Sequence, residues 1–216
     1  MKLKSKGRLY MSYQSKIIVG IYSYLQDHND KEIEALFEDA INVFNALGSW
    51  VYGGTSPKIV YPELQLFVKK ANNSNTESFL HLLDYINWVG NTIYKKLEDN
   101  QWIEDHYYES FTLEQSNDVT TGLLFMWRLG WLIVSIKDTS KENEEPMLLQ
   151  TLKTFDNLFD AFGGWVYNRE ELINVTQSLL EFESIFEEKF SPIYDEILEE
   201  ARNMMENIAK FLHKFK

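Results

Sequence analysis

The stretch INVFNALGSWVY at residues 41–52 recurs 115 positions further along the chain, within FDNLFDAFGGWVYN at residues 155–168. Seven of the twelve aligned positions are identical, whereas chance would give about one. Both copies end in the pattern Gly-x-Trp-Val-Tyr. Similarity at a fixed offset is the mark of duplicated structural units. The sequence therefore predicts that the second half of the chain repeats the first.

The 115-residue offset also matches apolar positions outside this motif. Met11, Ile18, Leu64 and Ile93 correspond to Met126, Ile133, Leu179 and Ile208. Apolar residues recur with helical spacing along most of the chain, and no alternating strand pattern is clear. We expect an all-α protein, built as a tandem duplication of two four-helix units that pack as a helical bundle-like pseudo-dimer.

Four segments follow from this pattern. They are a basic N-terminal tail over residues 1–9, a first repeat over 10–100, an acidic and aromatic connector over 101–124, and a second repeat over 125–216. The tail has three interpretations: a disordered segment, a cloning remnant, or an upstream start with Met11 as the natural first residue. Within the first repeat, Asn29 or Asp30 is the expected N-cap of the second helix.

Charge and cysteine content narrow the classes of function. The net charge is −12, and all of the surplus lies after residue 100, where 22 acidic residues face 10 basic ones. Such acidity disfavours direct nucleic-acid binding and adhesion to anionic membranes. The chain has no cysteine, which excludes disulfides and thiolate chemistry and favours a cytoplasmic location.

One apolar stretch, Leu123–Ile136, needs an explanation because it contains Arg128. It is too short to cross a bilayer and predicts a helix that is buried on most sides. A guanidinium within such a helix needs a partner. Arg128 would pair with a carboxylate or cap a neighbouring helix, or else it would anchor an anionic ligand in a cavity.

The paired motif residues Trp50, Tyr52, Trp165 and Tyr167 have two interpretations. They would pack as core anchors beside Gly48 and Gly163. Alternatively, together with Arg128, they would line an aromatic cavity between the repeats that holds a small molecule.

The sequence predicts neither a metal site nor a cofactor. None of the four histidines recurs in the other repeat, and no Glu-x-x-His or His-Glu-x-x-His pattern is present. Residues 27–38 superficially resemble a calcium loop, but Glu32 stands where the sharp turn requires glycine. Phosphate-binding glycine patterns and nucleophile elbows are also absent. Since familiar catalytic motifs are missing, binding is favoured over catalysis.

The acidic tract in the second repeat is the strongest functional signal. A one-signed helical face steers a basic partner and fixes its orientation. The candidate partner-binding residues are Glu181, Glu183, Glu187, Glu188, Asp195, Glu196, Glu199 and Glu200. Ordinary solvation of an acidic surface is the alternative interpretation.

The leading hypothesis is a non-enzymatic cytoplasmic protein, an inhibitor, an immunity-type factor or a regulatory adaptor, that binds a basic protein through these acids. It predicts salt-sensitive binding that weakens when Glu187, Glu188, Glu199 and Glu200 are changed. The second hypothesis is a small-molecule binder or enzyme that uses the aromatic cavity. The sequence does not fix the oligomeric state.

Overall fold

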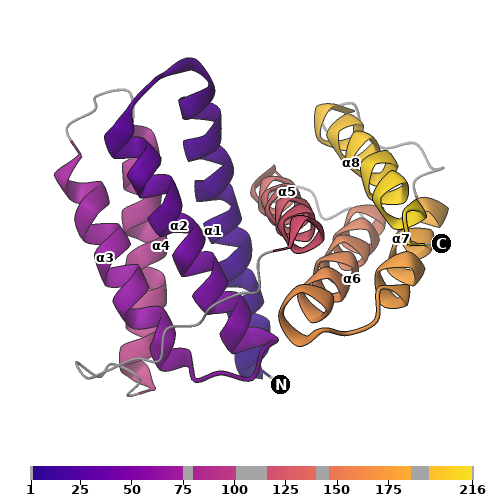
Figure 1. Cartoon of the computed structure of the whole chain (residues 1–216), viewed down its shortest axis with the longest axis horizontal. Helices are drawn as coiled ribbons and strands as arrows, with labels where there is room; N and C mark the ends of the chain where they lie inside the picture. Colours follow the sequence, from indigo (N-terminus) through magenta and orange to yellow (C-terminus); the bar gives the residue numbers. More distant parts are fainter. Residues whose placement is uncertain (1, 75–79, 101–115, 140–145, 186–194, 216) are drawn as a thin grey trace. The chain divides into compact units, whose positions relative to one another are not determined.

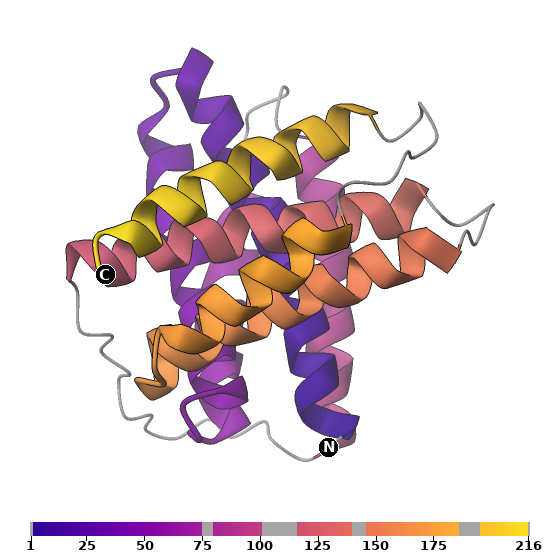
Figure 2. The same cartoon turned by 90° about the vertical axis from the view of Figure 1, so that its right-hand side faces the viewer.

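The computed structural model describes residues 2–74, 80–100, 116–139, 146–185 and 195–215. Within these ranges the regular structure is helical and no strand is present, so the all-α prediction is confirmed for the described residues. The chain divides into two compact units, Met1–Glu114 and Gln115–Lys216, and the described part of each contains four α-helices; Figures 1 and 2 show them in two views.

Unit 1 is an antiparallel helical bundle. Its elements are α1 (Lys2–Asp27), α2 (Lys31–Val51), the short 3-10 helix η1 (Pro57–Ile59), α3 (Val60–Asn73) and α4 (Leu80–Asp99). α1 packs against α2 and α4, and α3 packs against the same two helices. Phe44 and Phe67 are the largest fully buried side chains of this core.

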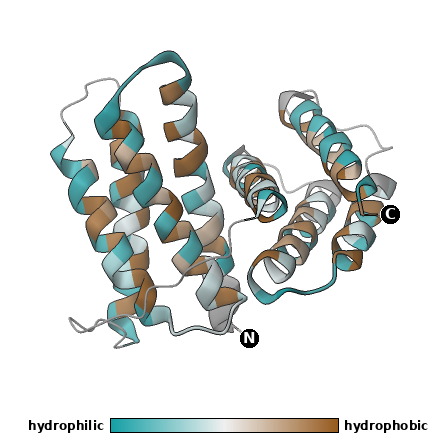
Figure 3. Cartoon of the chain, in the orientation of Figure 1, coloured by the Kyte–Doolittle hydropathy of each residue, from teal (hydrophilic) through white to brown (hydrophobic). Residues whose placement is uncertain are grey.

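Local sequence signals explain where α2 begins and which face it buries. The Asp30 carboxylate accepts hydrogen bonds from the backbone amides of Glu32 (3.0 Å) and Ile33 (3.2 Å), so the expected N-cap is confirmed. Apolar side chains at helical spacing are buried along the helix, among them Leu36 and Phe44. Figure 3 shows hydrophobic and hydrophilic sectors along α2 and α3.

Unit 2 has the same order of helices and the same packing pattern. It contains α5 (Asn117–Thr139), α6 (Pro146–Asn168), α7 (Ile173–Ile185) and α8 (Asp195–His213). α5 packs against α6 and α8, and α7 packs against the same two. Its core is built on Phe155, Phe159 and Phe162, all of them fully buried.

The helices of the two units correspond at the 115-position offset. Within the described residues, α1, α2 and α4 occupy the stretches that match α5, α6 and α8. α3 begins at Val60 and α7 at Ile173, yet the buried Val60 and Leu64 still match the buried Val175 and Leu179.

The turn after the second helix also has the same geometry in both units. The amide of Thr55 donates to the carbonyl of Ser49, and the amide of Glu170 donates to the carbonyl of Gly164, both at 3.2 Å. The residue before each donor has a left-handed backbone, with φ of 74° at Gly54 and 54° at Arg169. These residues also correspond at the 115-position offset.

A close helix contact anchors the first helix of each unit. A Cβ on Gly7 would lie 2.5 Å from Cγ2 of Val51, and one on Gly122 would lie 2.5 Å from the ring of Trp165. Real Cβ atoms do not approach so closely, so only glycine fits at these two places without a shift.

The first helix of each unit begins earlier in the chain than the sequence suggested. α1 begins at Lys2 rather than near residue 10, because Gly7 packs on Trp50 and Val51 and extends the helix through the supposed tail. α5 begins at Asn117 rather than near residue 125. Ser116 caps it by accepting from the amide of Val119 at 3.2 Å. The rest of the connector, residues 101–115, lies outside the described residues.

Candidate functional site

The acidic candidates in unit 2 differ in their environments. Glu181 on α7 and Glu199 on α8 are exposed, whereas Glu200 is half-buried. Glu183, Asp195 and Glu196 belong to α7 or α8, but their side chains are outside the described residues, as are Glu187 and Glu188 altogether. The described acids therefore lie on two different helices.

The exposed face of α8 carries both signs of charge in its described part. Glu199 and Glu206 alternate there with Arg202 and Lys210. Lys210 lies 3.8 Å from Glu206 as an exposed i,i+4 pair, which contributes little to stability. This face differs from the one-signed face that the sequence suggested for the last helix.

The α7 face, which we define as Ile173, Gln177, Leu180 and Glu181, keeps a single sign of charge. These four residues are exposed and share one side of the helix by their spacing. Ile173 and Leu180 are exposed by 50% and 60%. Residues 170–185 contain four acids and neither lysine nor arginine, and the exposed Arg169 directly precedes them. Exposed apolar side chains with one-signed charge are typical of protein-recognition surfaces.

Arg128 has the carboxylate partner that its position requires. Its guanidinium Nη2 donates to Oε1 of Glu200, which joins α5 to α8. The two side chains remain 41% and 30% exposed. Glu200 is thus engaged within unit 2, and the interpretation of Arg128 as a structural ion pair accounts for the contact.

The aromatic residues of the repeated motif pack inside their own units. Trp50 is 6% exposed and lies against Gly7. Trp165 contacts Gly122 and the ring of Phe211, with ring centroids 5.6 Å apart. These contacts agree with the interpretation of the tryptophans as core anchors.

The motif tyrosines differ in burial. Tyr167 is buried, and this burial raises the pKa of its phenol well above the ordinary value. Tyr52 is the C-cap residue of α2 and is half-buried. Tyr167 thus adds to the core of unit 2.

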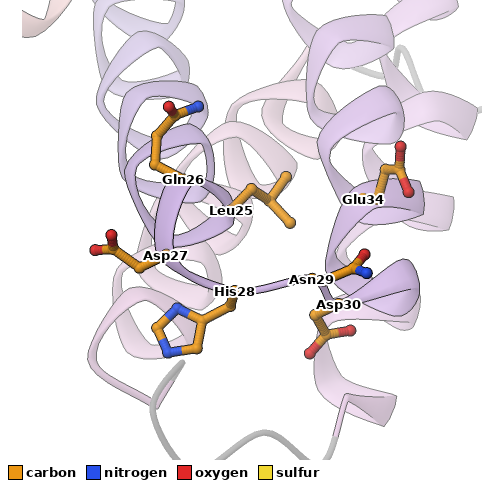
Figure 4. Close-up of a pocket in the computed structure, with 7 residues that line it drawn as sticks. All are labelled: Leu25, Gln26, Asp27, His28, Asn29, Asp30 and Glu34. Atoms are coloured by element: carbon orange, nitrogen blue, oxygen red, sulfur yellow. The ribbon is translucent and has the colours of Figure 1, made fainter.

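A surface pocket of about 480 Å³ lies at the turn between α1 and α2, where Asp27, Asp30 and Glu34 contribute carboxylates. Figure 4 shows the side chains of Asp27 and Glu34 pointing away from each other. Asp30 is already the N-cap of α2, and His28 donates to the carbonyl of Tyr24 at 2.9 Å. The described residues hold no group of three metal-ligating side chains placed to bind an ion.

α5 is long and apolar enough to cross a membrane by length and composition, over Asn117–Asp138. However, 61% of that stretch is buried within the structure, and Arg128 is paired inside it. These features are typical of the core helix of a folded domain.

Unit 1 has an aromatic cluster that was not predicted from the sequence. Tyr13 on α1 and Tyr85 and Trp88 on α4 meet there, and Trp88 is 49% exposed. Helical spacing alone does not show which positions of two different helices meet, so no signal for the cluster is visible in the sequence. No family model, curated protein or solved structure matches this chain.

Proposed function

We propose that this is a non-enzymatic, cytoplasmic protein-binding protein, of the inhibitor, immunity-factor or adaptor type, whose acidic second half binds a basic protein. The observation that carries the proposal is the α7 face, where Ile173 and Leu180 are exposed beside Glu181 in a segment without basic residues. Apolar side chains would supply contact area to such a partner, while the carboxylates would orient it.

The same observation favours α7 over α8 as the centre of the binding surface. α8 presents alternating charges, and Glu200 is held by Arg128. We keep Glu183, Glu187 and Glu188 as proposed partner-binding residues because they follow Glu181 in the sequence. The aromatic-cavity hypothesis gains no support, since Trp50 and Trp165 pack against residues of their own units.

Capture of proteins from a cell extract tests the proposal. The full-length protein is expected to retain a basic protein at low salt and to lose it at high salt. The variant Glu181→Gln/Glu183→Gln should lose the same protein at low salt. The matched control is Glu199→Gln/Glu206→Gln, which removes two acids from the mixed face of α8 and should bind as the wild type does. Equal retention by all three proteins would refute the proposal.

We also propose that the chain arose by tandem duplication and that its halves pack as a bundle-like pseudo-dimer. The equivalent turn hydrogen bonds, the left-handed residues Gly54 and Arg169, and the paired contacts of Gly7 and Gly122 support a common origin. Independent sequences have no reason to share such details at one fixed offset.

A further inference from the structure

The first and fourth helices of unit 1 meet in an aromatic–basic seam, which we define as Tyr13 and Lys16 on α1 with Tyr85 and Trp88 on α4. The rings of Tyr13 and Trp88 pack edge to face with centroids 5.0 Å apart, and Tyr85 lies 5.6 Å from Trp88. The ammonium group of Lys16 lies 5.0 Å from the centroid of the Tyr85 ring. The seam thus combines an exposed aromatic surface with a positive charge.

Unit 2 shows that the fold does not require this aromatic cluster. At the 115-residue offset, the positions of Tyr13, Tyr85 and Trp88 are occupied by Arg128, Glu200 and Asn203. Arg128 and Glu200 form an ion pair between the first and fourth helices of that unit. Polar residues occupy the corresponding positions of unit 2, so folding does not require an exposed tryptophan at position 88. We therefore look for a role of Trp88 beyond folding.

α1 contributes positive charge to the seam. Lys16 belongs to the seam, and the helix has no acid before Asp27. On α4, the exposed Asp84 and Lys95 lie four and seven residues from Trp88, and Lys96, Glu98 and Asp99 follow at the end of the helix, so α4 adds no net positive charge. Lys6 is exposed and, at seven residues from Tyr13, lies on the same side of α1.

The α7 face has the opposite character. It exposes Ile173 and Leu180, and its surrounding segment, residues 170–185, has four acids and no base. One molecule therefore carries two exposed surfaces that both offer apolar contact and that complement each other in charge. α7 corresponds to α3 in the repeat rather than to α1 or α4, so a contact between the two surfaces joins non-equivalent faces.

We propose that the aromatic–basic seam of one molecule docks on the α7 face of a second copy of this chain. The contact is heterologous, so each pair leaves one seam and one α7 face free for further copies. The inference builds on the proposed function, because the α7 face is the same surface, and it names a second copy as a partner of that surface.

Sedimentation velocity of the full-length protein over a range of concentrations tests this self-association. The wild type is expected to grow beyond a monomer as concentration rises. The seam variant Tyr13→Arg/Tyr85→Glu/Trp88→Asn carries residues that unit 2 already accommodates, so it should fold. It should weaken association by about tenfold or more, as the loss of an interface hot spot does. Leu180→Glu on the α7 face should have the same effect.

A mixture of the two variants distinguishes this geometry from other contacts. The seam variant retains a working α7 face, and Leu180→Glu retains a working seam. Together they are expected to form a one-to-one dimer that grows no further. Leu66→Glu, an exposed position on α3 outside both faces, should associate as the wild type does. Circular dichroism of each variant checks that the helices are intact.

Several results would overturn the inference. A wild type that stays monomeric at every concentration would do so, as would association that is unchanged in either variant, or variants that fail to pair when mixed. A monomeric wild type that still captures a basic protein through Glu181 and Glu183 would refute self-docking and leave the proposed function standing. Loss of that capture in the Glu181→Gln/Glu183→Gln variant, with self-association intact, would refute the charge complementarity from which self-docking is argued and would leave the proposed function standing.

Discussion

Gly7 and Gly122 are single residues that set the distance between two helices. Replacing either with alanine adds a Cβ that would lie 2.5 Å from Val51 or from Trp165. Although alanine favours a helix over glycine by about 1 kcal/mol, the overpacking should cost about 1–3 kcal/mol. We expect both Gly7→Ala and Gly122→Ala to lower the free energy of unfolding, as measured by urea denaturation.

Gly20→Ala on α1 is the matched control for helix propensity. Its Cβ would lie 3.1 Å from the flexible end of the Leu82 side chain, which can move by a few tenths of an ångström. This variant should therefore be neutral or slightly stabilising. If all three substitutions raise the free energy of unfolding by a similar amount, an added Cβ at Gly7 or Gly122 does not overpack the helix contact.

Arg169 occupies a left-handed backbone position that glycine occupies in the other unit. Its φ is 54°, compared with 74° at Gly54. The left-handed region costs a residue with a Cβ about 1–2 kcal/mol, so Arg169→Gly should raise the free energy of unfolding by about 1 kcal/mol. Gly54→Ala should lower it by a similar amount, although a Cβ there meets open space. Chemical denaturation measures both changes. Changes of opposite sign in the free energy of unfolding would support backbone strain, and changes of the same sign would exclude it.

The interface between α2 and α3 contains a group of charges that unit 2 lacks. Lys70 on α3 contacts both carboxylate oxygens of the buried Asp39 on α2, at 3.0 and 2.7 Å. Glu63 is half-buried, and burial, with a smaller contribution from Asp39, raises its pKa above the ordinary 4.5. At the 115-residue offset, unit 2 has Thr154, Ser178 and Ile185 instead.

The raised pKa of Glu63 predicts how stability depends on pH. Because the folded state binds this proton more tightly than the unfolded state, the protonated carboxyl contributes stability below about pH 4.5. That contribution is lost as the pH rises through the folded pKa. Glu63→Gln should therefore be more stable than the wild type at neutral pH, and the difference should shrink in acid.

Thermal unfolding across this pH range measures the difference. Glu38→Gln, an exposed position on α2, is the control and should not show the same pH dependence. A Glu63→Gln variant that is less stable than the wild type at neutral pH would contradict burial as the cause of the raised pKa of Glu63.

The elements themselves were largely predictable, because short-range signals define them. The cap at Asp30 was one of the two expected from the sequence. Ser56, directly before Pro57, accepts from the amide of Lys58 at 3.3 Å in the same way. The start of α1 was missed because four basic residues without an acid are unusual in the first two turns of a helix. Gly7 and Gly122 are both glycine and lie 115 positions apart, outside the repeated motif. This match would have predicted that both first helices begin earlier.

Contacts between elements were not predictable in the same way. The sequence showed that Arg128 needed a partner but not that Glu200 on α8 would supply it, since this depends on the relative rotation of two helices. For the same reason the cluster of Tyr13, Tyr85 and Trp88 was missed. Glu199 and Arg202 show that counting acids along a helix does not give the sign of its exposed face.

At the scale of the whole molecule, each unit has the elements of a complete small domain. Every helix packs against two others of its own unit, and each unit has its own buried phenylalanines. Chains of about 100 residues bury enough surface to fold alone. We expect residues 1–114 and residues 115–216, produced as separate fragments, to be helical by circular dichroism and to unfold cooperatively.

The duplication adds a further expectation for these fragments. If the halves descend from one self-associating ancestor, the separate fragments should recognise each other when mixed, because a pseudo-dimer retains the interface of the original pair. Analytical ultracentrifugation of the mixture should show a one-to-one complex, with each fragment alone as its control. Two folded fragments that stay apart at every concentration would leave independent folding intact and refute the pseudo-dimer. Fragments that fold only in the mixture would instead show that neither core is sufficient by itself.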